Sequence, residues 1–185
     1  MAMCRCLPLI ACLLLAACGN EQGRPPDVSA PVRPAGSTAV TFATQGVGFA
    51  APGGWHVRAG TAPLVATVQS GSALIAIWRY PRTEPLPATH GQLAQARGLL
   101  LQAAKARDAT FVAAKSAITR VRSHPAIQVR GTETVSGRPR TVRSTHVYAF
   151  GAEVVVDAYA PASVFGQVDR EAFVPLVRSL RLRAP

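Results

Sequence analysis

The chain has 185 residues and carries 20 Lys and Arg against 9 Asp and Glu, a formal net charge of +11. This length suits a single domain after removal of a leader. No apolar run reaches the roughly 20 residues that a helix needs to span a bilayer. The basic excess favours anionic partners. However, 18 of the 20 bases are Arg, which also fits the codon bias of a GC-rich genome, so both interpretations stay open.

The start of the chain has the pattern of a secretory leader. Residues 7–17 form an apolar segment of eleven residues, which matches a signal sequence and is too short for a membrane span. The segment ends in Leu15-Ala16-Ala17-Cys18, which resembles the lipobox of bacterial lipoprotein precursors. The resemblance implies cleavage between Ala17 and Cys18, transfer of diacylglycerol to the Cys18 thiol, and acylation of the new amino terminus, for example by palmitate. The alternative is an ordinary secreted protein, cut after an Ala-x-Ala site.

The cysteines support a lipid anchor. All four lie in the first 18 residues, so the processed chain keeps Cys18 alone. It can then form no internal disulfide and no cysteine-ligated zinc site. Two or three acyl chains hold a protein on a membrane durably, whereas one does not. We therefore expect an extracytoplasmic protein anchored to the cell membrane. Because Gly19 is not the Asp that signals retention, the outer membrane is open to it in a cell that has one.

The composition divides the chain into three parts. Residues 1–17 are the predicted signal peptide. Residues 18–37 are rich in Pro, Gly and polar side chains without a hydrophobic period, which predicts a lipidated N-terminus followed by a disordered linker. Residues 38–185 are predicted to form a single α+β domain.

Within the domain, apolar and β-branched segments bounded by turn residues predict strands at residues 40–44, 47–51, 64–69 and 73–80. Thr89 and Gln92 form a capping box that starts a helix running to about Arg107. A meander of four strands follows at residues 117–122, 126–135, 140–150 and 153–160. A last helix is expected with Asp169 as its cap. This order predicts an antiparallel β-sheet of about six to seven strands packed with two main helices.

Two motifs of the domain resemble those of PsbP-like domains. Residues 49–55, Phe-Ala-Ala-Pro-Gly-Gly-Trp, look like the Phe-x-x-Pro-x-Gly-Trp entrance of these domains. Residues 173–180 are similar to their closing helix, with Phe173, Val177, Ser179 and Leu180 in matching places. The resemblance spans roughly residues 40–183 and implies an antiparallel sheet between helices. It also implies a non-catalytic binding or accessory module, since the family offers no shared catalytic residues.

A polar cluster follows from the expected register of the last two strands. If Gly151 and Ala152 form a two-residue loop, His146 pairs with Asp157, and Ser144 lies on the same face of the sheet. Ser144, His146 and Asp157 would then be placed as nucleophile, base and orienting acid of a small hydrolase. The alternative is structural, with Asp157 satisfying a half-buried His146.

Six arginines of the meander are the expected docking surface for an anionic lipid or cell-wall polymer: Arg120, Arg122, Arg130, Arg138, Arg140 and Arg143. No aromatic residues alternate with them, so nucleic acid is not an expected partner. The four histidines have no metal-ligand spacing, so no metal or cofactor is expected, and the sequence names no protein partner. A third alternative is a carrier that holds a lipid or glycolipid in an apolar pocket between sheet and helices.

Overall fold

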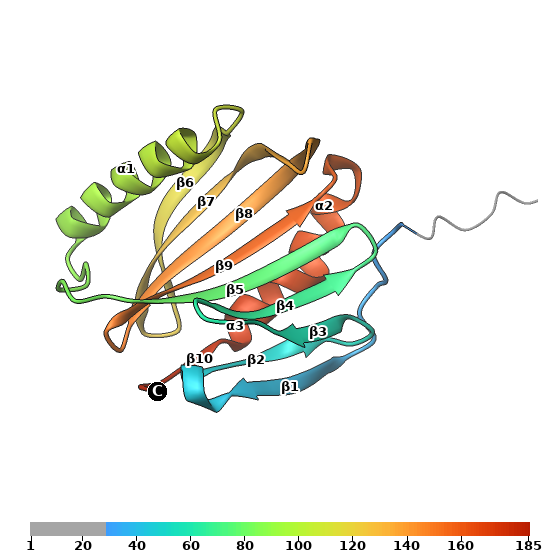
Figure 1. Cartoon of the computed structure of the whole chain (residues 1–185), viewed down its shortest axis with the longest axis horizontal. Coiled ribbons are helices and arrows are strands. Elements are labelled where there is room, and N and C mark those ends of the chain that lie inside the picture. The colour runs from blue at the N-terminus through green and yellow to red at the C-terminus, as the bar shows by residue number, and fades with distance from the viewer. Residues whose placement is uncertain (1–28) are drawn as a thin grey trace, which may run out of the picture.

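The computed structural model describes residues 29–185, so the predicted signal peptide and Cys18 lie outside the described residues. Seven strands form one antiparallel sheet in the order β3-β4-β5-β9-β8-β7-β6 (Figure 1). The strands are β3 (His56–Ala59), β4 (Leu64–Ser70), β5 (Ala73–Pro81), β6 (Val112–Val121), β7 (His124–Val135), β8 (Arg138–Ala149) and β9 (Ala152–Ala160). The predicted antiparallel sheet is confirmed.

A second, smaller sheet joins the two ends of the described chain. It contains β1 (Ser37–Phe42), β2 (Val47–Pro52) and β10 (Arg181–Leu182), with β2 in the middle. A 3-10 turn, η1 (Ala43–Gln45), connects β1 to β2 and ends at Gly46. Gly46 has a φ of 59°, and a Cβ there would lie 2.3 Å from the carbonyl oxygen of Arg183. Only glycine therefore lets the last residues pass so close to this turn.

The helices lie on both faces of the large sheet (Figure 1). Helix α1 (His90–Arg107) lies over β6 and β7. The other face is covered by α2 (Ala162–Val168), a π-helical turn η2 (Asp169–Phe173) and α3 (Val174–Ser179). The predicted capping box of α1 is confirmed: the Thr89 hydroxyl accepts from the Gln92 amide at 3.3 Å, and Gln92 Oε1 accepts from the Thr89 amide at 3.0 Å. No helix among residues 29–185 is long and apolar enough to cross a membrane.

The two faces have unequal hydrophobic cores. The larger core lies beneath α2, η2 and α3 and contains the fully buried side chains of Phe165, Phe173 and Leu176. The smaller core lies beneath α1, where Leu93 is the only buried residue of the helix. Four partly buried side chains of the helix also pack against this core: Ala96, Leu100, Leu101 and Ala104. Polar groups share the space between α1 and the sheet.

The described domain begins earlier than residue 38. The Val32 amide donates to Ser70 Oγ at 2.9 Å, and the Val32 carbonyl accepts from Trp55 Nε1 at 3.0 Å. The Ser72 amide donates to the Ser29 carbonyl at 2.8 Å. Residues 29–36 therefore pack against the domain, and the linker expected over 18–37 reaches too far. Hydrogen bonds to the turns of the sheet satisfy backbone groups that the Pro- and Gly-rich composition cannot pair locally.

The C-terminal helical region differs from its prediction. Asp169 is not a helix cap: the helical segment already begins at Ala162, and Asp169 is buried inside it as the first residue of η2. Its carboxylate binds Arg143 of β8 at 2.7 Å. A cap residue was expected because Asp favours helix starts, but a partner distant in the sequence decides its position here.

Candidate functional site

The turn between β8 and β9 sets the register of the candidate site. Phe150 and Gly151 occupy the loop with φ values of 50° and 64°, and Ala149 pairs with Ala152. The expected loop, Gly151-Ala152, is wrong, and the pairing is offset by two residues. An even offset keeps every side chain on its predicted face but changes its neighbours. Asp157 therefore pairs with Ser144 instead of His146, and His146 pairs with Val155.

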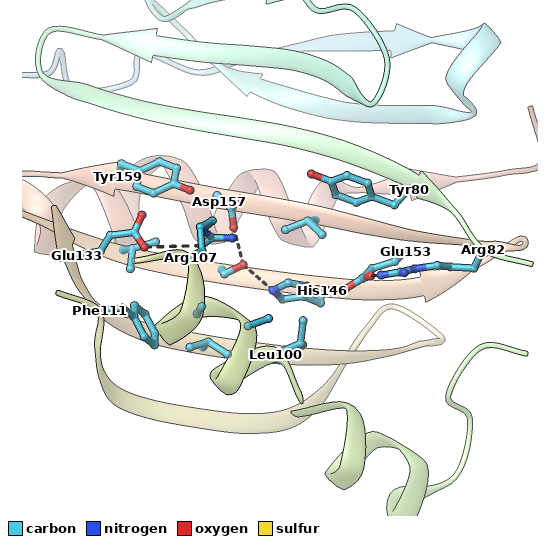
Figure 2. A pocket seen from close by; sticks show the side chains of 16 residues that line it. Tyr80, Arg82, Leu100, Arg107, Phe111, Glu133, His146, Glu153, Asp157 and Tyr159 are labelled. Atoms are coloured by element: carbon cyan, nitrogen blue, oxygen red, sulfur yellow. Dashed lines mark hydrogen bonds and ion pairs between the residues drawn. The ribbon is translucent and has the colours of Figure 1, made fainter. Parts of the chain in front are cut away.

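The structure brings Ser144, His146 and Asp157 together, with Glu153 as a fourth member (Figure 2). Ser144 Oγ lies 2.5 Å from Asp157 Oδ1 and 2.9 Å from His146 Nε2. His146 Nδ1 lies 2.7 Å from Glu153 Oε1, and the other oxygen of Glu153 binds Arg82. The acid that orients the histidine is thus Glu153, while Asp157 contacts the serine.

These contacts allow two arrangements of the same protons. In one, a protonated Asp157 donates to Ser144, and the Ser144 hydroxyl donates to His146 Nε2. In the other, Ser144 donates to an ionised Asp157, and His146 is an imidazolium that donates from both ring nitrogens. Glu153 accepts from His146 Nδ1 in both. The two arrangements have the same number of protons and the same net charge, so the contacts between these side chains are compatible with either one.

Burial and hydrogen bonds act differently on the two carboxyl groups. Burial raises the pKa of Asp157, and the hydrogen bond from Ser144 only partly opposes it. Burial also acts to raise the pKa of Glu153, but hydrogen bonds from His146 and Arg82 outweigh it and hold this pKa below its usual value. Glu153 therefore loses its proton more readily than an ordinary glutamate, and Asp157 less readily than an ordinary aspartate.

The cluster faces a cavity of about 240 Å³ between α1 and the sheet (Figure 2). A hollow of about 380 Å³ adjoins it under the loop that precedes α1 and shares Arg82, Leu100, Ala103 and Glu153 with it. A hollow of about 500 Å³ over β4 and β5 shares Glu133 and Tyr159 with the central cavity. We call these three adjoining spaces the α1 groove.

The walls of the α1 groove are aromatic and charged. Trp78 and Tyr80 stack at a centroid distance of 6.4 Å and each lines one of its hollows. Arg107 of α1 forms an ion pair of 3.8 Å with the buried Glu133 of β7. Burial raises the pKa of Glu133, and Arg107 opposes this rise. Burial, with the charge of Asp157, also raises the pKa of Tyr159.

The six arginines of the expected docking surface do not share one face. Side chains alternate along β8, so Arg138 and Arg140 lie on the side of α1, while Arg143 lies on the side of α3. Arg130 also lies on the α3 side, 5.1 Å from the ring centroid of Phe165. The remaining two, Arg120 and Arg122, line a separate cavity with Arg143. The single basic face expected from the sequence is therefore wrong.

Sequence reasoning missed Glu153, although a signal was present. Glu153 lies four residues before Asp157 in the same strand, so the two side chains share a face. Arg82, Arg107 and Glu133 come from a loop, a helix and another strand, and no local pattern places them near the cluster. Among residues 29–185, no group of three or more His, Cys, Asp or Glu side chains is arranged to hold a metal ion.

No protein-family model matches the chain, and no curated protein matches it. Solved structures share its fold. The solution structure of cyanobacterial PsbP (CyanoP) from Synechocystis sp. PCC 6803 has a TM-score of 0.62 and 10% identity, over 80% of this chain and 94% of that chain. LpqN of Mycobacterium tuberculosis, described as involved in cell envelope biogenesis, has a TM-score of 0.56 and 15% identity, over 80% of this chain and 91% of that chain. At such identities the likeness concerns the fold alone: the domain has the PsbP-like α+β fold.

Proposed function

We propose that the chain is an extracytoplasmic lipoprotein, anchored to a membrane by acyl chains on Cys18, that acts as a non-catalytic binding or accessory module. Its ligand site is the α1 groove. The lipobox-like Leu15-Ala16-Ala17-Cys18 supports the anchor. Both fold relatives reported above, one of them described as involved in cell envelope biogenesis, are compatible with such a module.

The α1 groove is the observation that carries the binding role. Ligand sites are typically concave, with largely apolar walls and a few convergent polar groups. The central cavity combines both kinds of wall, because the apolar Leu100, Phe111 and Val142 line it together with the polar Ser144 cluster.

The chemistry of the α1 groove favours an amphiphile, as in the lipid or glycolipid carrier alternative. Arg82 is paired with Glu153, and Arg107 with Glu133, so the central cavity offers hydrogen-bond donors and acceptors instead of one dominant charge. Hydroxyl groups of a polar head suit such a surface. The apolar hollow beside Leu99 and Leu100, where Leu99 is 58% exposed, suits an acyl or alkyl portion.

The path of the chain supports access from the membrane. Ser29, the first described residue, binds Ser72 in the turn between β4 and β5, and Ser72 also lines the hollow over these strands. Ser29 thus lies beside the turn that borders one end of the α1 groove. An amphiphile that leaves the membrane near the anchor would meet this end first.

Native mass spectrometry of the full, membrane-extracted protein tests this proposal. Ala103 and Ala106 are both exposed on α1, but Ala103 lines two hollows of the α1 groove and Ala106 lines none of them. We expect a co-purifying amphiphile in the wild type and in Ala106→Trp, and its loss in Ala103→Trp. Equal occupancy in the two variants, or no bound amphiphile in the wild type, would contradict the assignment of the groove.

A small hydrolase is the second candidate. Ser144 Oγ, His146 and Glu153 have the contacts of nucleophile, base and orienting acid, at 2.9 Å and 2.7 Å. Two features oppose it. Asp157 also holds the Ser144 hydroxyl, and Ser144 lies in a strand paired on both sides, so its backbone amide is committed to the sheet instead of to an oxyanion.

Labelling with a fluorophosphonate, which modifies activated serines, separates the two candidates. A hydrolase would be labelled at Ser144, and Ser144→Ala would lose both labelling and any ester hydrolysis. An unlabelled wild type that still carries a bound amphiphile supports the binding module.

Docking on anionic envelope components is the second part of the proposal. The net charge of +11 supports it. Because the six predicted arginines lie on two faces, docking needs a more specific site than the whole meander.

A further inference from the structure

A cavity of about 390 Å³ lies on the other face of the sheet, between α3 and the turn that joins β6 to β7. Four arginines line it: Arg120, Arg122, Arg143 and Arg178. Its floor is apolar and includes Val121, Phe173 and Val177, and the amide of Gln128 reaches its wall. We call this space the arginine cavity.

We propose that the arginine cavity binds a phosphate group, either on a lipid headgroup or on a soluble ligand. The proposal rests on the docking part of the proposed function and is independent of the α1 groove, which lies on the opposite face of the sheet. It replaces Arg130, Arg138 and Arg140 of the expected surface by Arg178.

The charges of the arginine cavity are largely uncompensated. Arg143 is paired with Asp169, whose two carboxylate oxygens lie 2.7 and 2.9 Å from the guanidinium. Among residues 29–185, no other arginine of the cavity forms an ion pair with a carboxylate. Arg120, Arg122 and Arg178 are all exposed. Cations that converge on a concave site with an apolar floor concentrate the electrostatic potential there, which attracts anions.

Two of the arginines are held in place before any ligand arrives. Arg143 also donates to Gln128 Oε1 at 2.9 Å and lies 5.4 Å from the ring centroid of Phe173. Arg120 donates to the carbonyl of Ser123 in the adjoining turn. Arg143 uses both terminal nitrogens for Asp169 and Gln128 and so fixes the wall of the cavity. Within the described part of the chain, the guanidinium forks of the exposed Arg122 and Arg178 are not engaged in this way, and such a planar fork matches two oxygens of a phosphate. A phosphate fits this donor set better than a single carboxylate, because it offers oxygens to several arginines at once.

The proposal is tested with two triple variants of equal charge. Arg120→Gln, Arg122→Gln and Arg178→Gln together remove the free charges of the cavity. Arg130→Gln, Arg138→Gln and Arg140→Gln together remove three charges elsewhere and form the matched control. Each protein is titrated with inorganic phosphate and followed by NMR. Each is also sedimented with vesicles of phosphatidylcholine alone or with phosphatidylglycerol in equal parts.

We expect phosphate to shift wild-type signals around Gln128 and Arg143. We also expect the cavity variant to bind at least ~10-fold more weakly, since hydrogen bonds to charged groups contribute roughly that factor each or more. The control should bind like the wild type. Vesicle binding that the cavity variant alone loses would identify a lipid headgroup as the source, and unchanged vesicle binding a soluble phosphate.

Three outcomes would overturn the proposal. Shifts scattered over many arginines show that phosphate has no site. Equal losses of phosphate binding in both triple variants would show that the total charge of the protein binds phosphate and that the cavity is not a specific site. Anionic docking would then remain supported. No binding of phosphate or of anionic vesicles by the wild type removes both the cavity site and anionic docking. The α1 groove and its amphiphile are unaffected in each case.

Discussion

Nδ1 of His146 lies 2.7 Å from Oε1 of Glu153, and this contact connects the rim of the α1 groove to its floor. On the rim side, Glu153 binds Arg82. On the floor side, His146 contacts Ser144, and Ser144 contacts Asp157. Glu153 and Asp157 are both shielded from bulk water, and both line the α1 groove. A change in the protonation of either acid should therefore alter the stability of the fold and the surface that a ligand contacts.

Glu153→Gln is expected to destabilise the fold. The Glu153 side chain is 4% exposed, so its neutralisation leaves the buried end of the cluster, next to His146, without its anion and also removes the partner of Arg82. Breaking a buried pair on one side costs about 3 kcal/mol or more. That figure applies to pairs with both partners buried, whereas Arg82 is half exposed and partly screened by solvent. We therefore expect a smaller loss, of roughly 2 kcal/mol, in the free energy of unfolding. Urea unfolding at neutral pH measures it, with the exposed Glu84→Gln as control. Equal midpoints for both variants would show that the pair is not stabilising.

The pH dependence of the same variant has a defined sign. The pKa of Glu153 is lower in the folded state than its ordinary value of 4.5, so the stability it contributes is present above pH 4.5 and is lost as the pH falls through the folded-state pKa. Wild type should therefore lose stability below pH 4.5 more steeply than Glu153→Gln. Parallel curves of unfolding free energy against pH for the two proteins would contradict the lowered pKa.

Asp157→Asn is expected to show the opposite trend. Burial raises the pKa of Asp157 above its ordinary value of 3.8, so its contribution is present below that pH and is lost as the pH rises through the folded-state pKa. The side chain that replaces Asp157 is neutral at every pH. The free energy of unfolding of the variant should therefore rise relative to that of the wild type as the pH increases from acid to neutral. Chemical unfolding at several pH values tests this. A stability difference between the two proteins that stays constant, or that moves in favour of the wild type towards neutral pH, would contradict it.

Local signals predicted the parts of the fold that depend on neighbouring residues. Thr89 and Gln92 are three residues apart, and their mutual hydrogen bonds could be foreseen. Strand β10 has only two residues, and contacts with β2 distant in the sequence create it. The loop at Phe150 could not be foreseen in the same way, because a positive φ is uncommon for any residue other than glycine.

The candidate site was predictable only in part, for the same reason. Alternation along a strand places Ser144 and His146 on one face whatever the register. Which acid contacts His146 depends on the register of the two strands and on the position of each side chain in the cavity. The structure identifies that acid as Glu153. The arginines of the meander could be counted from the sequence. Their division between the two faces of the sheet depends on the alternation of side chains and on which helices cover each face.

Thr89→Ala is expected to loosen the start of α1. The variant loses the hydroxyl that accepts from the Gln92 amide, and the loss of such a cap costs about 1 kcal/mol. Because Leu93 in the next turn is the only buried residue of the helix, fraying should extend to the contact that holds α1 over the groove. Hydrogen exchange of the amides of residues 91–95 should quicken, while β9 stays protected. Unchanged exchange at these amides would show that packing alone fixes the helix start.

Trp55→Phe is expected to release the N-terminal segment without unfolding the domain. Phenylalanine keeps most of the buried ring but cannot donate to the Val32 carbonyl, a bond of 3.0 Å. The loss of one such hydrogen bond costs about 1 kcal/mol. Limited proteolysis should cut residues 29–36 faster in the variant, while the remaining domain resists. Equal cleavage rates would mean that the other bonds of this segment suffice.

Cys18→Ser is expected to abolish membrane retention. The serine hydroxyl cannot accept the diacylglyceryl group as the thiol does, so the chain would lose the acyl chains that hold it durably on a bilayer. Cys12→Ser is the matched control, because residue 12 lies in the segment that cleavage before Cys18 removes. Membrane and soluble fractions are compared by immunoblotting, and intact mass reports acylation. We expect Cys12→Ser to remain acylated in the membrane fraction and Cys18→Ser to remain unprocessed or to become soluble. Processed Cys18→Ser protein that stays with the membrane like the wild type would exclude the lipid anchor, and with it the supply of amphiphile to the near end of the α1 groove.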